Sequence, residues 1–405
     1  MCLTALSRPR RSPASRLLWL TGLGMLAFCL LWATTIPQAR AASLSVNRTQ
    51  WDSVAVNAQG IGIPAIDLSL SGGEQQFAYY AAASGLGYYA RQSGGSWTMH
   101  ALNQLQGNLD PNLPVTAKCH TGDDGQTSVT FVGVSPDQSQ AVDCTFTASL
   151  GASNSFSVQG QSPFNFSLAA FAALGPDAWI AMALVLMCFG VKHMALALNG
   201  DLFTGAFGGG AWAMTLLWAG VAAAALVSLC LTNGVTPNIF FVGGSGVMLA
   251  TMMASGAWAM QTVLGGIAPD QVFALSSASW GPALACCVLM GATLMVLTQG
   301  TYGLGTRQGS ESWQNQTLAE NVDGKQAVAF DSWGRLHVVF RDAGSGDLVL
   351  ALQDNGQWQR HQIDQVESLN LADMEIASDG TVHILTVQRA GGNDALVQYQ
   401  VNVGR

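Results

Sequence analysis

One stretch decides the fold: Gly344-Ser345-Gly346-Asp347-Leu348-Val349-Leu350-Ala351-Leu352-Gln353-Asp354-Asn355-Gly356-Gln357-Trp358-Gln359-Arg360-His361-Gln362-Ile363. A glycine-rich turn opens it and a strand-like run ends near Ala351; Asn355-Gly356 then makes a second turn before Trp358 and an alternating segment. An Asn-Gly pair between two alternating apolar runs is a strong signal for a β-hairpin. The stretch therefore predicts two antiparallel strands joined by a tight turn.

This phrase recurs along the chain. Ser84-Gly85-Leu86-Gly87-Tyr88-Tyr89-Ala90 leads through Gly94-Gly95 to Trp97, and Gly244-Ser245-Gly246-Val247-Met248-Leu249-Ala250 leads through Ser255-Gly256 to Trp258. The turn with its following aromatic residue returns about every 50 residues, which is the mark of a repeat architecture. The landmarks are Trp51, Trp97, Phe156, Phe203, Trp258, Trp313 and Trp358, of which the two Phe members are the weakest.

A second hairpin lies upstream of these landmarks, for example at residues 228–242, 329–340 and 375–385. Each period therefore holds four short strands, and four strands in about 50 residues is the spacing of a β-propeller blade. We expect an all-β fold, a seven-bladed β-propeller, with six or eight blades as open alternatives.

The repeats resemble those of sialidase-like and lectin-like β-propellers, which run strand, glycine turn, His-Val-Val-like strand, hairpin and Gly-x-Trp. Here Gly334, His337-Val338-Val339 and Gly356-Gln357-Trp358 carry the resemblance, which extends over about residues 45–405. Such a ring usually closes by lending one terminal strand to the blade at the other terminus. The last period has three strands, so the resemblance implies one domain, 42–405, closed by an N-terminal strand at 46–57. The expected blades are 62–102, 103–158, 159–208, 209–265, 266–318, 319–366 and 367–405.

The N-terminal segment has the organisation of a secretory signal. Four arginines (8, 10, 11 and 16) precede an apolar run from Leu17 to Ile36, and Ala39-Arg40-Ala41 offers a small-x-small cleavage site. We expect residues 1–41 to be a signal peptide and the protein to be exported, periplasmic, secreted or at the cell surface. An uncleaved membrane anchor is the alternative, because the apolar run is about 20 residues long.

The composition limits the partners. The net charge is -8, and only 10% of the residues are charged. Without the five arginines of residues 1–41, the remaining chain has 11 basic and 24 acidic residues. Nucleic-acid binding needs clustered Lys and Arg, so no nucleic-acid partner is expected.

The segment 168–300 is unusually apolar, with four charges: Asp177, Lys192, Asp201 and Asp270. Hydropathy alone would place transmembrane helices near 177–199, 211–231, 239–264 and 283–298, and a multipass membrane protein is one alternative. Glycine, asparagine and proline nevertheless recur at blade-like intervals, and the 244–263 phrase matches 344–363. Strands buried on both faces lose their alternation, so the segment favours blades whose apolar outer wall contacts a membrane or a protein.

The cysteines do not indicate a metal site. Cys119 and Cys144 lie in one expected blade, on strands one and three, about 9.6 Å apart, beyond the roughly 7 Å Cα limit for a disulfide. A bridge between them would require a distorted blade. The other cysteines lie in apolar runs, no Cys-x-x-Cys pair exists, and Cys286-Cys287 point to opposite faces of a strand. No zinc site and no cofactor are expected.

The candidate ligand-binding residues lie in the last two blades. Asp331, Asp373 and Glu375 fall on predicted innermost strands, where a channel carboxylate can bind sugar hydroxyls, act as an acid or base, or merely be solvated. Arg335, Arg341 and Asp342 flank the same blade and would make a polar pocket, with Trp333 beside Arg335. His337 and His383 share one repeat position, which favours packing between strands.

No catalytic motif accompanies these residues. The chain lacks a nucleophile elbow, a zincin helix, a P-loop and a Rossmann fingerprint, and it also lacks the Ser-x-Asp-x-Gly-x-Thr-Trp boxes of sialidases. No catalytic residue is assigned. The resemblance therefore implies an exported, non-enzymatic β-propeller that binds a glycan, an envelope component or a protein partner. A degenerate glycosidase or lyase propeller is the alternative within this fold.

Overall fold

The computed structural model describes the following residues: 44–51, 65–71, 73–82, 84–102, 105, 107–112, 115–121, 127–136, 140–150, 156–160, 164–167, 180–186, 192–198, 201–208, 211–219, 227–232, 236–244, 246–280, 283–299, 313–354, 356–390 and 393–403. The expected signal peptide, 1–41, lies outside them, as do residues 52–57 of the expected closing strand. Residues Ser45–Asn402 form one compact unit, and the fold described below is the fold of that unit.

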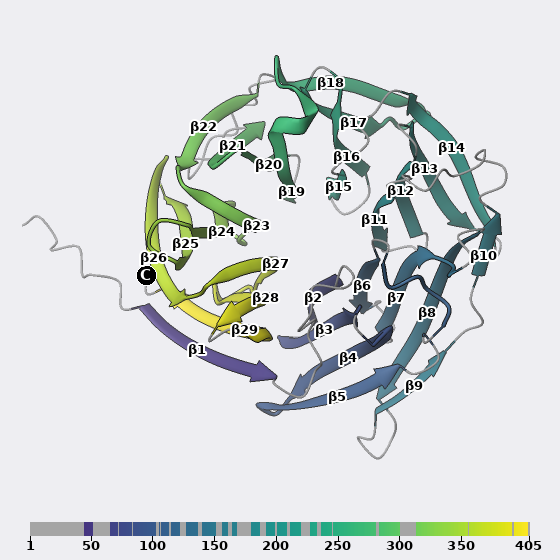
Figure 1. Cartoon of the computed structure of the whole chain (residues 1–405), viewed down its shortest axis with the longest axis horizontal. Coiled ribbons are helices and arrows are strands. Elements are labelled where there is room, and N and C mark those ends of the chain that lie inside the picture. The colour runs from purple at the N-terminus through teal and green to yellow at the C-terminus, as the bar shows by residue number, and fades with distance from the viewer. Residues whose placement is uncertain are drawn as a thin grey trace, which may run out of the picture. The chain divides into compact units, whose positions relative to one another are not determined.

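The described strands form seven antiparallel sheets (Figure 1). Sheet 1 contains β2 (Ala65–Ser71), β3 (Glu74–Ala81), β4 (Leu86–Ser93) and β5 (Ser96–Leu102). Sheet 2 contains β6 (Thr116–Thr121), β7 (Thr127–Val134), β8 (Gln140–Leu150), β9 (Phe156–Gly160) and β10 (Phe164–Ser167). Sheet 3 contains β11 (Ile180–Leu186), β12 (Lys192–Leu198), β13 (Asp201–Gly208) and β14 (Ala211–Ala219). Sheet 4 contains β15 (Val227–Thr232), β16 (Thr236–Gly243), β17 (Gly246–Met252) and β18 (Trp258–Gly265).

The last three sheets complete the repeat. Sheet 5 contains β19 (Val272–Trp280), β20 (Ala283–Met290), β21 (Thr293–Gln299) and β22 (Gln314–Ala319). Sheet 6 contains β23 (Val322–Phe330), β24 (Leu336–Asp342), β25 (Asp347–Asp354) and β26 (Gln357–Gln365). Sheet 7 contains β27 (Ser368–Ile376), β28 (Val382–Ala390), β29 (Asn393–Val403) and, beside β29, β1 (Leu44–Trp51).

In sheets 1 and 3 to 6 the strands follow one another in chain order, so each of these sheets is a meander; sheet 7 is a meander of β27, β28 and β29 to which β1 adds the outer strand. The first strands contact one another in succession: β2, β6, β11, β15, β19, β23 and β27, with β27 also touching β2 (Figure 1). Sheet 2 differs, because its outer edge is built from two short strands, β9 and β10, that both pair with β8. Sheets 2 and 3 also extend further along the chain than the expected blades 103–158 and 159–208.

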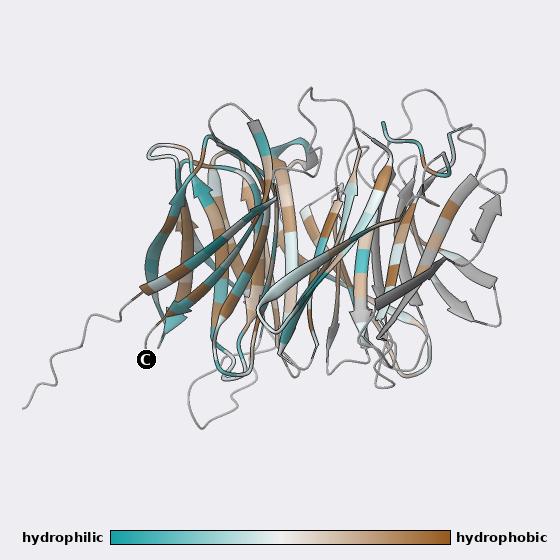
Figure 2. Cartoon of the chain, turned by 90° about the horizontal axis from the view of Figure 1, so that it is seen from below, coloured by the Kyte–Doolittle hydropathy of each residue, from teal (hydrophilic) through white to brown (hydrophobic). Residues whose placement is uncertain are grey.

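The apolar segment 168–300 is built from strands in its described part. The alternative of helices near 177–199, 211–231, 239–264 and 283–298 is wrong there, because β11 to β21 occupy these positions. Among the described residues, no helix has the length and hydrophobicity needed to span a membrane. The apolar runs are explained by burial: all residues of β20 except Met290 are buried, and so are all residues of β16 except Thr236. Figure 2 shows brown, hydrophobic residues along the strands.

The outer strands of four sheets share the same irregularity of register. In sheets 3 to 6 the fourth strand has one extra residue relative to the third, a β-bulge. The extra residues are Leu217, Val263, Leu318 and Ile363. Each lies five positions after a tryptophan, namely Trp212, Trp258, Trp313 and Trp358. The landmark expected at Phe203 is therefore wrong, because Phe203 lies on the third strand, β13, and the outer strand of sheet 3 carries Trp212.

Two further expectations, one about the cysteines and one about an apolar outer wall, can be compared with the structure. Cys119 on β6 and Cys144 on β8 are both buried free thiols, and β7 pairs between their strands. Outer strands of the apolar region do expose hydrophobic side chains: Leu216 and Trp218 on β14 are 51% and 37% exposed. Contact of this wall with a membrane or a protein stays a prediction.

Candidate functional site

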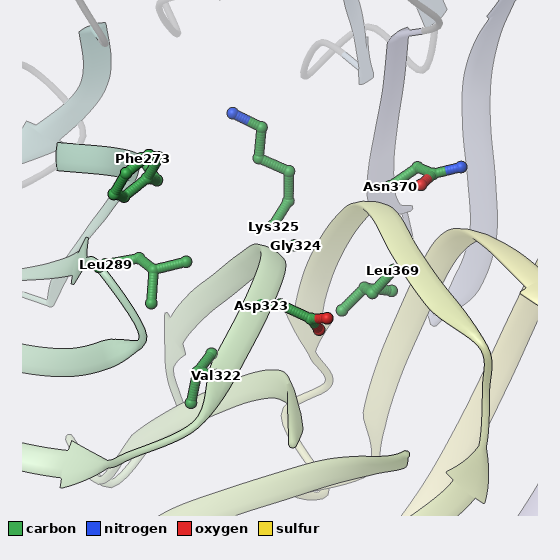
Figure 3. A pocket seen from close by; sticks show the side chains of 9 residues that line it. Phe273, Leu289, Val322, Asp323, Gly324, Lys325, Leu369 and Asn370 are labelled. Atoms are coloured by element: carbon green, nitrogen blue, oxygen red, sulfur yellow. The ribbon is translucent and has the colours of Figure 1, made fainter. Parts of the chain in front are cut away.

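A pocket of about 470 Å³ lies between sheets 5, 6 and 7 (Figure 3). It is found where the first strands of these sheets begin, next to the turn between β20 and β21. Its lining residues are Phe273, Leu289, Gly291, Val322, Asp323, Gly324, Lys325, Leu369 and Asn370. Three neighbouring sheets therefore contribute to one hollow, and no single repeat contains it.

The pocket is built from bulges. In sheet 5, Phe273 is left out of the β19–β20 ladder, and in sheet 7, Asn370 is left out of the β27–β28 ladder. In sheet 6 the bulge is larger, because residues 324–326 together lie opposite Phe340 between the pairs Asp323–Arg341 and Ala327–Val339. Bulges re-aim side chains and are frequent next to functional sites. Here they turn Phe273, Lys325 and Asn370 toward the same pocket.

Glycine is required at the centre of the largest bulge. Gly324 has φ +76°, and a Cβ atom there would lie 2.1 Å from the carbonyl oxygen of Leu369. Because glycine has no Cβ atom, the bulge of β23 can pack directly against the backbone at the start of β27. Leu369 and Val322 are almost fully buried, so the floor of the pocket is apolar and tightly packed.

The rim of the pocket is aromatic and charged. Phe273 is 57% exposed. Asp323 accepts hydrogen bonds from Nη1 of Arg341 at 2.7 and 2.6 Å, and Nε of Arg341 donates to the carbonyl oxygen of Val366 at 2.8 Å. Lys325 forms no ion pair within the described part of the chain, and burial lowers the pKa of its ammonium group. Arg341, one of the expected ligand-binding residues, therefore supports the pocket through Asp323.

A second polar cluster lies on the first strands of sheets 7, 1 and 2. Lys118 on β6 donates to Oδ1 of Asp67 on β2, and the backbone N–H of Cys119 donates to Oδ2 of Asp67 at 2.7 Å. The backbone N–H of Leu68 donates to Oδ2 of Asp373 on β27 at 2.6 Å. Glu375 is exposed two residues further along β27. Three carboxylates and one ammonium group thus join three consecutive sheets.

The pKa values in this cluster follow from burial and from like charges. Burial raises the pKa of Asp67 to about 6, against the lowering effect of Lys118. Desolvation by the surrounding strands, together with the negative charges of Asp373 and Asp67, raises the pKa of Glu375 to about 8, although the residue is exposed. Burial alone would lower the pKa of Lys118, but Asp67 and Asp373 raise it above its ordinary value. Among the described residues, no group of His, Cys, Asp and Glu is arranged to hold a metal ion.

Asp331 does not line a channel, which corrects the sequence-based expectation. It lies in the turn after β23, and its side chain is fully buried. Its Oδ1 accepts from the backbone N–H groups of Trp333 and Arg335 at 2.9 and 2.8 Å, and its Oδ2 accepts from Nε of Arg335 at 2.7 Å. Nε2 of His337 is 3.2 Å from the same oxygen. Asp331 therefore organises a turn and is not available to a ligand.

Trp333 and Arg335 belong to the same turn. Trp333 is 41% exposed, with the guanidinium carbon of Arg335 5.2 Å from its ring centroid. A Cβ atom added at Gly380 would meet the Trp333 ring at 2.9 Å, and one at Gly334 would meet Trp280 at 2.7 Å. Each tryptophan thus covers the turn glycine of the next sheet, which is a packing role.

The expected polar pocket of Arg335, Arg341 and Asp342 is wrong. Arg335 precedes β24, whereas Arg341 and Asp342 end it, so the strand separates them. Asp342 accepts from the backbone N–H groups of Gly344 and Ser345 at 2.8 and 3.1 Å and closes that turn. His337 and His383 are buried between strands, as expected.

Several residues of the two clusters escaped the sequence reading: Asp67, Lys118, Phe273, Lys325 and Asn370. A usable signal existed for some of them. Asp67 is a lone acid inside an apolar strand, and Lys118 and Lys325 are two of the three lysines in the chain. Nothing local marks Phe273 or Asn370, because their role follows from the strand register.

Comparison with known proteins supports the fold. No protein-family model matches the chain, and no curated protein matches it either. Among solved structures, a mutant of AofleA from Arthrobotrys oligospora covers 79% of this chain and 90% of its own, with a TM-score of 0.51 and 15% identity. A mutant of the Aleuria aurantia lectin in complex with α-methyl-L-fucoside covers 75% and 95%, with a TM-score of 0.50 and 13% identity.

A Trypanosoma rangeli sialidase in complex with sialic acid covers 89% of this chain and 60% of its own, with a TM-score of 0.48 and 10% identity. Identities this low concern the fold alone, and the fold assignment rests on the first two structures. The Aleuria lectin is a six-bladed β-propeller. The fold-level resemblance to lectin-like β-propellers, predicted from the repeats, is confirmed.

Proposed function

We propose that this chain is an exported, non-enzymatic β-propeller that binds a glycan in the pocket between sheets 5, 6 and 7. The observation that carries the proposal is the pocket itself, in which bulges of three adjacent first strands present an exposed aromatic ring, an amide and an ammonium group. A concave site with an apolar floor and a few converging polar groups is the usual form of a small-ligand site. Because the protein is proposed to be exported, an envelope glycan exposed outside the cell is the ligand class that we propose.

The proposal includes seven blades in one ring that β1 closes. Seven sheets among the described residues, and the succession of first-strand contacts that returns from β27 to β2, support it. The coverage values agree with it too: the six-bladed Aleuria lectin is spanned almost completely by three quarters of this chain.

The test is a glycan array probed with the full chain and two variants. Phe273→Ala removes the aromatic face of the pocket, and we expect binding to weaken roughly 5- to 30-fold, since stacking contributes roughly 1–2 kcal/mol. Trp333→Ala is the matched control. Trp333 is also an exposed aromatic residue, in the turn that follows β23, but it lies outside the pocket. Loss of binding in Trp333→Ala with full binding in Phe273→Ala would place the site elsewhere, and no glycan binding at all would reject the proposal.

A second candidate function is favoured by one observation, the raised pKa of Glu375 beside Asp373 and Asp67. A carboxyl group with a raised pKa next to further carboxyl groups has the composition of a glycosidase or lyase site. Hydrolysis or elimination of a polysaccharide that disappears in Glu375→Gln would establish this enzyme function in place of simple binding. Asp331 is excluded from such a role by its burial in the turn.

A further inference from the structure

Among the described residues, the positive charge of Lys325 in the pocket has no ion-pair partner. Two charged groups of β23 meet there, Asp323 and Lys325, one on each side of Gly324. Asp323 is neutralised, because Nη1 of Arg341 contacts both of its carboxylate oxygens. Figure 3 shows the Lys325 side chain extending away from Asp323, between Phe273 and Asn370. The pocket therefore keeps one positive charge in a chain whose net charge is -8.

The position of this ammonium group is unusual for a lysine. Lys325 belongs to a bulge of three residues that leaves the ladder of sheet 6, and the residue as a whole is only partly exposed. Ordinary surface lysines extend into water, where an unpaired charge costs little. A charge withdrawn from water without a partner destabilises the protein, and an anion in the pocket would remove that cost.

The residues next to Lys325 place further requirements on the ligand, besides its negative charge. Phe273 lies on one side of the Lys325 side chain and is exposed, and Asn370 lines the pocket on the other side, with its amide directed away from Lys325 (Figure 3). The amide can donate and accept hydrogen bonds. Sugars offer an apolar C–H face for the ring and hydroxyl groups for the amide. Inorganic anions offer neither, so the three groups together suit a larger ligand than a simple ion.

We infer that the pocket takes an anionic sugar, whose carboxylate or sulfate pairs with Nζ of Lys325 while its ring lies on Phe273 and a hydroxyl bonds to Asn370. This inference rests on the proposed glycan-binding function and narrows it. It excludes neutral sugars as the preferred ligands. The carboxylate and the sulfate share one chemistry here, and the experiment separates them.

The experiment uses the full chain and matched pairs of saccharides in low-salt buffer. Uronic-acid oligosaccharides are compared with their methyl esters, and sulfated oligosaccharides with their desulfated forms. We expect at least one acidic member to bind about tenfold or more tightly than its neutral partner, and we expect this preference to shrink as salt is added. The tighter acidic class identifies the carboxylate or the sulfate as the natural group.

Lys325→Met is the decisive variant, because it keeps most of the length of the unbranched side chain and removes the ammonium group. We expect it to lose the preference for the acidic member, whereas Lys325→Arg keeps most of it. Arg48→Met, which removes an exposed positive charge outside the pocket and outside the second polar cluster, serves as the control and should keep the preference. Thermal unfolding of each variant establishes that it is folded.

The outcomes separate the inference from the function on which it rests. Equal affinity for acidic and neutral members, with binding that still depends on Phe273, would overturn the inference and leave the proposed function standing. A charge preference that survives in Lys325→Met would also overturn it. If no saccharide on the array or in these pairs binds the wild-type chain, both the inference and the proposed function are wrong.

Discussion

At the residue scale, the buried carboxylate of Asp331 shows how a single group can organise a turn. It receives four donors from three residues within six positions of the chain. Burial would raise its pKa, but hydrogen bonds from His337 and Arg335 outweigh burial and lower the pKa to about 2. The ionised form is therefore the one that the fold requires.

Asp331→Ala should destabilise the protein by about 2–3 kcal/mol at neutral pH, because it leaves buried donors without an acceptor. The depressed pKa adds a pH signature: the stabilisation is present above the ordinary carboxyl pKa near 4 and is lost as the pH falls toward 2. Urea unfolding at pH 7 and pH 3 measures both effects.

Asp342→Ala is the control for this prediction, since Asp342 closes the turn at the other end of β24 in a more exposed position. Its loss should cost about 1 kcal/mol. Equal costs for the two variants would contradict the role assigned to the buried carboxylate.

At the element scale, the bulges decide both the packing and the pocket. Outer-strand bulges at Leu318 and Val263 place apolar residues among the buried side chains of sheets 5 and 4. First-strand bulges have the opposite effect, because they bring Phe273 and Lys325 to a solvent-accessible pocket. A single extra residue thus reverses the face on which a side chain lies.

Gly324→Ala should destabilise the protein by more than about 2 kcal/mol, since the new Cβ would combine a positive φ with a backbone clash against Leu369. Gly356→Ala is a matched control, because Gly356 has nearly the same φ, +77°, but no atom within 4 Å of the added Cβ. It should cost only about 1 kcal/mol. Denaturant unfolding of both variants is the measurement, and similar losses would show that the contact between β23 and β27 is unimportant.

At the scale of the whole molecule, β1 connects neighbouring sheets. Trp51 packs edge-on against Phe77 and Trp97 of sheet 1, with ring centroids 5.1 and 5.2 Å apart. Arg48 forms an ion pair of 3.1 Å with Asp364 of sheet 6. A strand from the N-terminal end of the chain therefore contacts sheets on both sides of the one it completes.

Trp51→Ala should lower stability by about 3 kcal/mol, because it removes a large aromatic side chain from a cluster that joins two sheets. Arg48→Ala, which breaks only an exposed ion pair, should cost less than about 1 kcal/mol. Thermal unfolding of the full chain compares the two. A larger loss in Arg48→Ala than in Trp51→Ala would contradict the proposed closure through apolar packing.

The carboxylates between sheets 7 and 1 should make stability depend on pH. The folded-state pKa values of Asp67 and Glu375 are raised, to about 6 and about 8. Their contribution is therefore fully present below the ordinary carboxyl range and is lost as the pH rises through these values. We expect the wild-type chain to lose stability between about pH 4 and pH 8.

Glu375→Gln tests this, because it should flatten the upper part of the profile, between about pH 6 and pH 8. The gain at pH 9 should be no more than about 1 kcal/mol, since solvent reaches the side chain and screens its charge. Urea midpoints at pH 5, 7 and 9 provide the comparison, with Glu367→Gln as a control outside the cluster. Parallel profiles for wild type and Glu375→Gln would refute the coupling.

The sequence by itself determined the all-β fold and its repeat. Turn glycines, the Asn355-Gly356 pair and regularly spaced tryptophans act locally, so they can be recognised without any knowledge of distant contacts. The same local rules indicated that His337 and His383 pack between strands. They failed at Phe203, because an aromatic residue after a glycine turn looks alike on a third or a fourth strand.

Only the tertiary structure decided which residues meet. Lys118 and Asp67 face each other across two sheets, and the pocket joins Phe273, Lys325 and Asn370 from three. Their meeting depends on bulges and on contacts between sheets, which one extra residue in a strand can shift and which no local pattern records. The physical reason is that each sheet forms from hairpins between strands adjacent in the sequence. The site instead depends on strand register and on packing between different sheets.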